Sequence, residues 1–229
     1  MIYITGDIHG DVSRIGVFCD YKKLTADDTI VILGDAGLNY LGGDNDSGKK
    51  RYIASLPITV LCIHGNHEMR PQTIDSYRET EWHGGTVFVE DKYPNILFAK
   101  DGEVYDLDGK RAIAIGGAYS VDMAYRLLKG LRWFPDEQPS DEIKARVEEK
   151  LCKLSGKVDI VLSHTCPAKY IPTEAFLPGL NQLMVDRSTE EWLDRIEDGL
   201  SYERWYCGHW HIDKSTDSMR FLFEEFDTL

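Results

Sequence analysis

The sequence has no hydrophobic run that approaches the ~18 residues of a membrane-spanning helix. Nor does it open with the basic segment and the apolar stretch of roughly 7–15 residues that mark a secretory signal peptide. Residues Ile2–Thr5 instead have the pattern of a short buried strand that leads into polar residues. We therefore expect a soluble, cytoplasmic protein that has no membrane partner.

Cysteines and basic residues are both scarce. The five cysteines form an odd set without a C-x-x-C pair, which suits reduced thiols in a cytosol better than a disulfide framework. The 26 Lys and Arg residues are outnumbered by 39 Asp and Glu residues, and the formal net charge is -13. Because sequence-independent binding to nucleic acid needs clustered Lys and Arg, we expect no such binding.

A chain of 229 residues, of which 42% are hydrophobic and 11% aromatic, is long enough for one substantial core. The sequence contains no repeat, low-complexity segment or linker that would divide it. We therefore predict a single domain over residues 1–229.

Apolar, β-branched runs that end in Gly, Asp or His recur along the chain and are typical of buried strands. They are Ile2–Thr5, Thr29–Leu33, Ile58–Ile63 and Val158–Leu162. The stretches Asp11–Leu24 and Ser47–Leu56 have the pattern of helices and lie between the first three runs. This β-α-β-α-β opening predicts a parallel sheet whose strand ends carry polar residues.

The middle of the chain has a different pattern. An antiparallel meander is predicted there from short strands separated by turn signals, at Thr86–Glu90, Asn95–Ala99, Glu103–Leu107 and Lys110–Gly116. Helices are expected at Ser140–Leu154, with Ser140 as N-cap, and at Thr189–Glu197. Near the end of the chain, Met219–Phe226 is expected to form a hairpin.

Five of the seven histidines follow the predicted strands, together with two aspartates and one asparagine. Asp7 and His9 are two residues apart, so in an extended backbone both side chains project to one side and can share a metal. The same reasoning makes His209 and His211, after the strand-like Tyr202–Cys207, a second pair. A central sheet would bring them to one rim with the remaining candidates, which are Asp35, Asn66, His67 and His164.

Five short motifs contain these residues in order along nearly the whole chain. They are Gly6-Asp7-Ile8-His9-Gly10, Gly34-Asp35, Gly65-Asn66-His67-Glu68, Ser163-His164 and Gly208-His209-Trp210-His211. Together they resemble the calcineurin-like metallophosphoesterase superfamily, in a form close to its bacterial and phage phosphatase-like members. The resemblance implies an α/β fold: a four-layer α/β/β/α sandwich of two mixed sheets flanked by helices, with the site between the sheets.

The resemblance also implies how two metal ions are held. Asp7, His9 and His211 would bind the first ion. Asn66, His164 and His209 would bind the second, and Asp35 would bridge the two. His67 is left without a metal and is the candidate general acid or charge stabiliser. The alternative is that His67 only packs beside Asn66.

Imidazole and carboxylate ligands suit two divalent transition-metal ions, Mn²⁺ foremost and Fe, Zn²⁺, Co²⁺ or Ni²⁺ as other options, rather than Ca²⁺. With a bridging hydroxide and the charges of Asp7 and Asp35, the centre keeps a formal charge of about +1, which attracts phosphate. An aspartate in place of Asn66 would cancel that charge. We therefore predict metal-dependent hydrolysis of phosphate esters by a dinuclear metal-activated hydroxide.

One motif departs from the Ser/Thr protein phosphatases that the sequence otherwise resembles. Those proteins carry Asp and Arg where this chain has Leu38 and Asn39, so that assignment is weakened. Phosphomonoesters and phosphodiesters both stay open as substrates, whether small organic phosphates, nucleotides or phosphoproteins. Asn39 and Arg70 are the candidate substitutes for substrate binding. Segments 116–138 and 165–187 are long connections that either form substrate walls or cap the core.

The alternative from another class is a non-catalytic protein of this fold that uses the sheet rim to bind a protein partner. A scaffold of that kind has no need of a full set of metal ligands. All seven are present here, which favours the enzyme.

Overall fold

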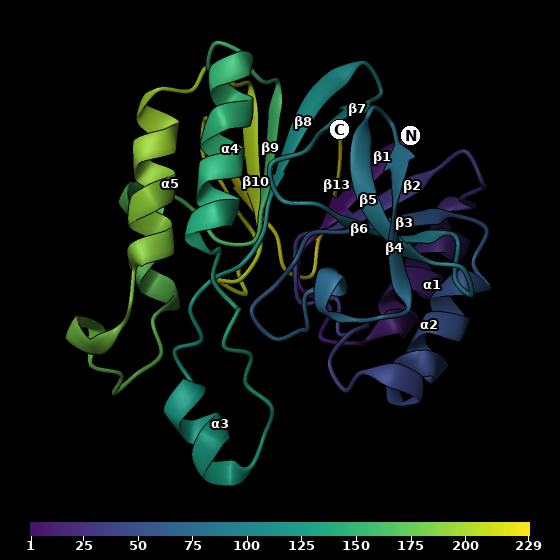
Figure 1. The fold of residues 1–229 in the computed structure, drawn as a ribbon, viewed down its shortest axis with the longest axis horizontal. Helices are drawn as coiled ribbons and strands as arrows, with labels where there is room; N and C mark the ends of the chain where they lie inside the picture. The colour runs from purple at the N-terminus through teal and green to yellow at the C-terminus, as the bar shows by residue number, and fades with distance from the viewer.

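The computed structural model describes residues 1–229, and its thirteen β-strands form two mixed sheets that pack face to face (Figure 1). The first three strands along the chain lie side by side and parallel in the seven-stranded sheet, as the β-α-β-α-β opening predicted. Its spatial order is β13 (Phe226–Thr228), β1 (Ile2–Thr5), β2 (Thr29–Ile32), β3 (Thr59–Cys62), β6 (Ile96–Ala99), β5 (Gly85–Glu90) and β4 (Tyr77–Trp82).

The six-stranded sheet has a parallel centre and antiparallel edges. Its spatial order is β11 (Lys214–Ser215), β12 (Met219–Phe221), β10 (Arg204–Cys207), β9 (Ile160–Ser163), β8 (Lys110–Ile115) and β7 (Val104–Leu107). The parallel strands of both sheets run toward the same end of the molecule, which collects the residues that follow them.

Helices cover the outer face of each sheet, so the fold has the four layers that the resemblance implied (Figure 1). α1 (Val12–Lys22) and α2 (Ser47–Ala54) cover the seven-stranded sheet, and α4 (Asp141–Lys153) and α5 (Ser188–Asp198) cover the six-stranded one. The predicted cap is confirmed, because the Ser140 hydroxyl accepts a hydrogen bond from the backbone N–H of Ile143 at 3.3 Å. Short 3₁₀ helices lie at Gly43–Asp46, Pro71–Thr73, Ala168–Tyr170, Thr173–Ala175 and Gln182–Met184.

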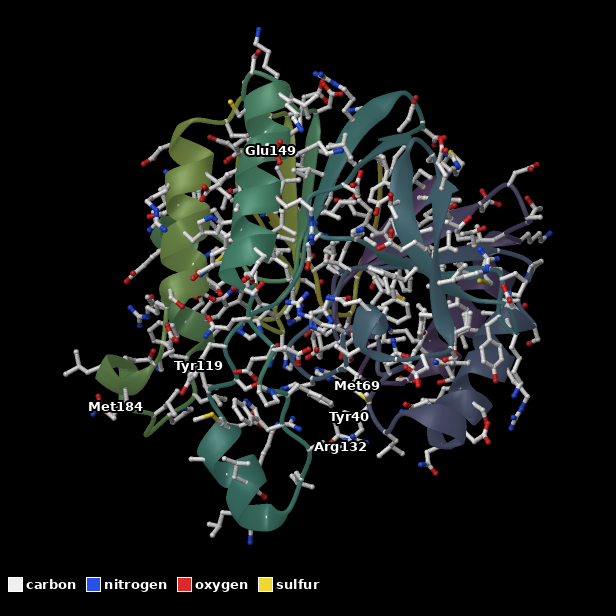
Figure 2. The ribbon with its side chains drawn as sticks, viewed as in Figure 1. Tyr40, Met69, Tyr119, Arg132, Glu149 and Met184 are labelled. Carbon is white, nitrogen blue, oxygen red and sulfur yellow. The ribbon has the colours of Figure 1, made fainter.

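One helix stands apart from these layers. α3 (Met123–Lys129) projects from the sandwich and buries none of its own residues. Tyr40, Met69 and Tyr119 lie at this end of the molecule, whereas Glu149 of α4 lies toward the other end (Figure 2). None of the helices combines the length and the hydropathy that crossing a membrane would need.

Three buried clusters hold the layers together. The largest lies between the sheets and contains, among others, Ile4, Leu61 and Leu162, each fully shielded from solvent. The other two lie between a sheet and its helices. Because both faces of the central strands are covered, β1, β2 and β9 are buried at every residue, which explains their uninterrupted apolar sequence.

Two predictions about strand pairing are wrong. The strands of residues 86–116 do not form one meander, because β5 and β6 belong to one sheet and β7 and β8 to the other. Nor does Met219–Phe226 form a hairpin: β12 pairs with β10, and β13 pairs with β1 in the opposite sheet. In each case a strand pairs with the unoccupied edge of a strand that is distant in sequence, where backbone hydrogen-bonding groups are available. Local turn signals do not reveal such distant partners. Edge strand β4, with its charged sequence, and helix α3 were not predicted.

Leu61→Ala should lower the free energy of unfolding by roughly 2–5 kcal/mol, because it leaves a cavity between the two sheets. Leu128→Ala is the matched control, since this side chain is 83% exposed on α3. It should change the stability by less than about 0.5 kcal/mol. Urea unfolding followed by circular dichroism measures both. Equal effects for the two variants would contradict the placement of the core.

Candidate metal centre

Polar side chains that follow strands of both sheets meet at one rim, as the sequence predicted. The loops after β1, β2 and β3 belong to one sheet, and the loops after β9 and β10 belong to the other. Contacts of 4.0 Å or less join all the predicted ligands into one network. Its members are Asp7, His9, Asp35, Asn66, His164, His209 and His211.

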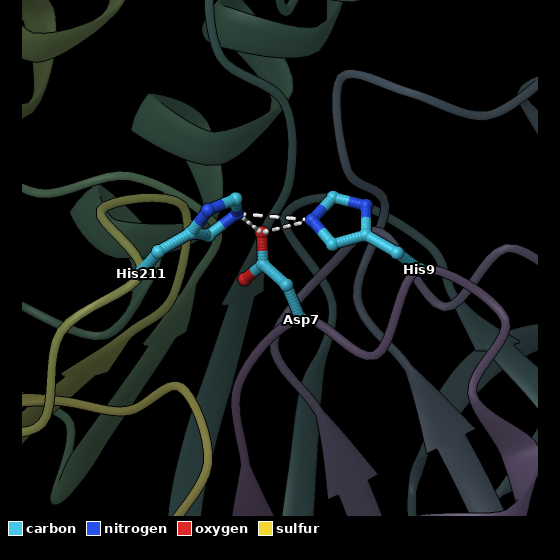
Figure 3. Close-up of side chains that lie close together, drawn as sticks. All are labelled: Asp7, His9 and His211. Carbon is cyan, nitrogen blue, oxygen red and sulfur yellow. Dashed lines mark hydrogen bonds and ion pairs between the residues drawn. The ribbon is translucent and has the colours of Figure 1, made fainter. Parts of the chain in front are cut away.

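The first group consists of Asp7, His9 and His211 (Figure 3). The Nε2 atoms of the two histidines are 2.9 Å apart, and Asp7 Oδ2 lies 3.4 Å from that of His211 and 3.8 Å from that of His9. Asp7 Oδ2 is buried and accepts no hydrogen bond. The second oxygen of Asp7 accepts a 2.8 Å hydrogen bond from the backbone N–H of His209, which fixes the carboxylate.

The second group consists of Asn66, His164 and His209, which also converge on one point. Asn66 Oδ1 lies 2.7 Å from His164 Nε2 and 3.1 Å from His209 Nδ1. His164 Nδ1 donates to the carbonyl oxygen of Leu33 at 2.7 Å, so in the neutral ring Nε2 carries a lone pair. The Asn66 amide nitrogen donates to Ser120 Oγ at 2.8 Å, so its oxygen faces that lone pair. In this tautomer of the neutral ring the lone pairs of Asn66 Oδ1 and His164 Nε2 point at each other, an arrangement that a bound cation would stabilise.

Asp35 lies between the two groups. Its Oδ2 is 3.8 Å from His9 Nδ1, and its Oδ1 is 4.0 Å from His164 Nε2. The same Oδ1 accepts a 2.7 Å hydrogen bond from the backbone N–H of His67. Asp35, Asp7 and His164 also form a group close enough to hold one ion. The carboxylate of Asp35 is therefore placed to reach toward both groups.

The backbone at four of these residues is not extended, contrary to the reasoning from strand geometry. His9, Asp35, His209 and His211 have φ values of 45°, 46°, 66° and 50°, in the left-handed region that side chains rarely adopt. Consequently, His209 and His211 do not form a pair: the first faces Asn66 and the second faces Asp7. The prediction that His209 and His211 form a pair through an extended backbone is therefore wrong.

Two glycines of the sequence motifs allow the carboxylates to approach the backbone. A Cβ at Gly65 would overlap Asp35 Oδ1, and a Cβ at Gly208 would overlap Asp7 Oδ1. Any larger residue at these positions would displace a carboxylate from the site.

Burial shapes the charges of the centre. Burial alone would raise the pKa of Asp7, but contacts with His164 and His211 outweigh it and hold this pKa below its usual range. Burial lowers the pKa of His209 well below its usual value, so its imidazole is neutral. Burial and the neighbouring Asp35 raise the pKa of Glu68 to about 8. Asp7 in turn raises the pKa of His211. The site therefore sets two buried carboxylates, those of Asp7 and Asp35, among imidazole nitrogens, which is a donor set suited to cations.

His67 lies beside the two groups and lines a cavity of about 340 Å³ together with Asp35 and Asn66. Burial lowers the pKa of its imidazole. Segment 116–138 supplies Tyr119, Ser120 and Asp122 to this cavity, and its far wall is apolar. That wall is formed chiefly by Ile171, Phe176, Leu180, Val185, Trp210 and Ile212.

The two predicted substrate-binding residues lie elsewhere. Asn39 is buried and accepts a 3.0 Å hydrogen bond from the hydroxyl of Tyr77. Arg70 is buried in an ion pair with Asp101, at 2.7 Å, and lines a separate cavity of about 220 Å³. Neither residue lines the cavity that contains His67, so the structure does not bring them to the candidate centre.

Three residues that contact the centre were not among the predicted site residues: Ser120, Asp122 and Arg126. They lie in segment 116–138, which was expected only as a wall of the site or a cap of the core. No periodicity or motif distinguishes them, because they approach the site through a long connection rather than a strand end. The only sequence feature that indicated their approach to the site was the length of that connection.

A family profile described as calcineurin-like phosphoesterase matches residues 1–213. No curated protein matches the chain.

Two solved structures are similar in shape. One is phosphopantetheinyl hydrolase (PptH) from Mycobacterium tuberculosis, at 13% identity and TM-score 0.48, with 97% of this chain and 87% of that chain covered. The other is TT1561 of Thermus thermophilus, at 12% identity and TM-score 0.49, with coverage of 90% and 80%. The profile spans nearly the whole chain and includes every residue of the two groups. The chain therefore belongs to the calcineurin-like phosphoesterase family.

Proposed function

We propose that this protein hydrolyses phosphate esters with the help of two divalent metal ions held at the rim between its sheets. The observation that carries the proposal is the convergence of ligand atoms from both sheets, with Asn66 Oδ1 2.7 Å from His164 Nε2 and 3.1 Å from His209 Nδ1. The buried, unbonded oxygen of Asp7 supports a cation in the first group in the same way. Because both sheets contribute donors, we also propose that residues 1–229 act as one domain.

The donors fit transition-metal ions. Asp7, His9 and His211 would hold one ion, and Asn66, His164 and His209 the other, with Asp35 shared between them. Imidazole donors favour Mn²⁺, Fe, Zn²⁺, Co²⁺ or Ni²⁺ over Ca²⁺, and we propose Mn²⁺ first. When bound, two such ions lower the pKa of water and neutralise charge on phosphoryl oxygens.

The residues of the chain prepare the site for this chemistry. The Leu33 carbonyl orients His164, and the Ser120 hydroxyl orients Asn66, so that each presents its acceptor atom inward. As a neutral ligand, Asn66 leaves the site more positive than an aspartate would. His67 is held over the cavity by the hydrogen bond from its backbone N–H to Asp35, and it would stabilise or protonate the departing alkoxide.

The cavity supports a small organic phosphate as the substrate. Its volume of about 340 Å³ suits a compact ligand better than a folded phosphoprotein. The phosphate would face His67, and the apolar part of the ester would face Trp210 and Phe176. Monoesters and diesters both fit this description.

The wild-type protein loaded with Mn²⁺ should hydrolyse aryl phosphate monoesters or diesters, and chelation should abolish the turnover. Metal analysis should find two ions per chain. Asp7→Asn should bind fewer ions, because the variant loses one of the two buried negative charges. Comparing the monoester with the diester decides between the two ester classes. Absence of turnover of either ester, with fewer than two ions per chain, would instead support a non-catalytic scaffold.

Asn66→Asp should retain both ions and slow turnover by about 10- to 100-fold, because the added negative charge weakens the attraction for phosphate. The geometry permits this change, since Ser120 Oγ can donate to the new carboxylate. Steady-state kinetics and metal analysis of the same preparation separate the two effects. A variant with unchanged kcat/KM would show that the charge of residue 66 is unimportant.

His67→Ala should retain both ions and lose roughly 10²- to 10⁴-fold in kcat for esters with poor leaving groups. For 4-nitrophenyl esters, whose phenolate leaves without protonation, the loss should be much smaller. A series of phenyl esters of rising leaving-group pKa measures this difference. Loss of metal in this variant, or an equal loss for every ester, would contradict the proposed role of His67.

A further inference from the structure

Helix α3 brings a charged pair to the candidate catalytic histidine. Arg126 Nη2 lies 3.2 Å from His67 Nε2, and Arg126 Nε donates to Asp122 Oδ2 at 2.8 Å. Asp122 Oδ1 lies 4.0 Å from the same His67 nitrogen. The two charged side chains are thus in contact with each other and meet at one atom of the site.

This contact lies outside the packed layers of the fold, although Arg126 also donates to the carbonyl oxygen of Arg132 at 3.3 Å. α3 buries none of its residues and projects away from both sheets (Figure 1). Even so, the Arg126 side chain is only 15% exposed, because it folds back toward His67. Asp122 Oδ1 is shielded from solvent and accepts no hydrogen bond. An unpaired carboxylate oxygen in such a place is costly unless a function maintains it.

The ends of the α3 segment are anchored on both sides of the site. Before the helix, Ser120 binds Asn66 through its hydroxyl and Glu137 through its backbone N–H. After the helix, Arg132 donates to the carbonyl oxygen of Leu41, in the loop that follows Asp35. Figure 2 shows Arg132 at the same end of the molecule as Tyr40 and Met69. The segment therefore spans the site and positions α3 beside it.

The site otherwise lacks a basic side chain at His67. Leu38 and Asn39, which follow Asp35, are buried, and Asn39 is bonded to Tyr77. Arg70 is neutralised by Asp101. Arg187 lines the same cavity but donates to Gln182 and lies over the ring of Phe176. Among these residues, no other arginine contacts His67.

We propose that Arg126 binds a phosphoryl oxygen of the substrate and that Asp122 positions Arg126 for this contact. Arg126 does not itself line the cavity, but unlike Asn39 and Arg70 it contacts His67, which does. A phosphoryl oxygen hydrogen-bonded to the His67 ring would therefore lie within reach of this guanidinium and could accept a charge-assisted hydrogen bond from it. Asp122 restrains the guanidinium through the i,i+4 ion pair on α3. The inference rests on the proposed function, since it assigns the phosphate-binding group of that site.

The test measures phosphate binding and turnover separately in the full-length, Mn²⁺-loaded protein. Arg126→Ala should weaken the binding of inorganic phosphate, measured by calorimetry, by roughly 10- to 100-fold and lower kcat/KM by at least as much. Arg126→Lys should recover part of the loss. Lys129→Ala is the matched control, because it removes the same charge from an exposed position of α3. It should change neither quantity by more than about twofold.

A double-mutant cycle tests the role of Asp122. Asp122→Ala alone should weaken phosphate binding. When it is added to Arg126→Ala, it should lower the phosphate affinity by less than about a further twofold, because Asp122 acts through Arg126. Full additivity of the two losses would refute this positioning role. Unfolding midpoints should match those of the wild type, since α3 buries no residue.

The outcomes distinguish this inference from the proposed function. If the wild type binds phosphate through Arg126 but hydrolyses no ester, the proposed function fails and the inference stands. If the wild type is active and Arg126→Ala leaves phosphate affinity unchanged, the inference is overturned and the proposed function stands. A wild type that neither binds phosphate nor turns over esters overturns both.

Discussion

The structure depends on the burial of two carboxylates, those of Asp7 and Asp35, at the rim between the sheets. A buried charge is stable only when hydrogen bonds or an opposite charge compensate for the water it has lost. Here each carboxylate accepts a backbone N–H from a loop at another strand end, His209 for Asp7 and His67 for Asp35. The bond to His209 joins the two sheets. The loops of the centre are therefore arranged around these two anions rather than around an apolar core.

Compensation of the carboxylates constrains the local backbone. Four residues of the centre adopt left-handed conformations that cost about 1 kcal/mol or more for residues other than glycine. Glycine at 65 and 208 is required because the carboxylate oxygens occupy the space of a side chain. Such strain persists only where the surrounding structure enforces it, and the packed strands beneath the loops provide that support. The buried core between the sheets therefore stabilises the geometry that the proposed chemistry needs.

Much of this arrangement could be predicted, and the failures have identifiable causes. The strands that precede Asp7, Asp35 and His164 are buried on both faces, so their apolar runs are unambiguous and the polar residues after them stand out. The pairing of β13 with β1 could not be predicted, because three residues near the end of a chain carry no signal of which sheet they join. The position of Arg126 against His67 could not be predicted either, because a connecting helix without a buried face has no periodicity that indicates where it lies.

The sequence by itself predicted the buried strands and the polar residues that follow them, because strand patterns and ligand chemistry are local properties. The resemblance of the ordered motifs to the calcineurin-like metallophosphoesterases implied the layered α/β architecture, the seven metal-ligand candidates and the class of reaction. The resemblance also implied the division of those candidates into two sets, but the contacts within each set, with His209 beside Asn66 and His211 beside Asp7, came from the tertiary structure. So did the location of Asn39 and Arg70 away from the cavity and of Asp122 beside His67. Distances between side chains that are far apart in sequence follow from sheet packing and loop paths, and neither is encoded in any short stretch of residues.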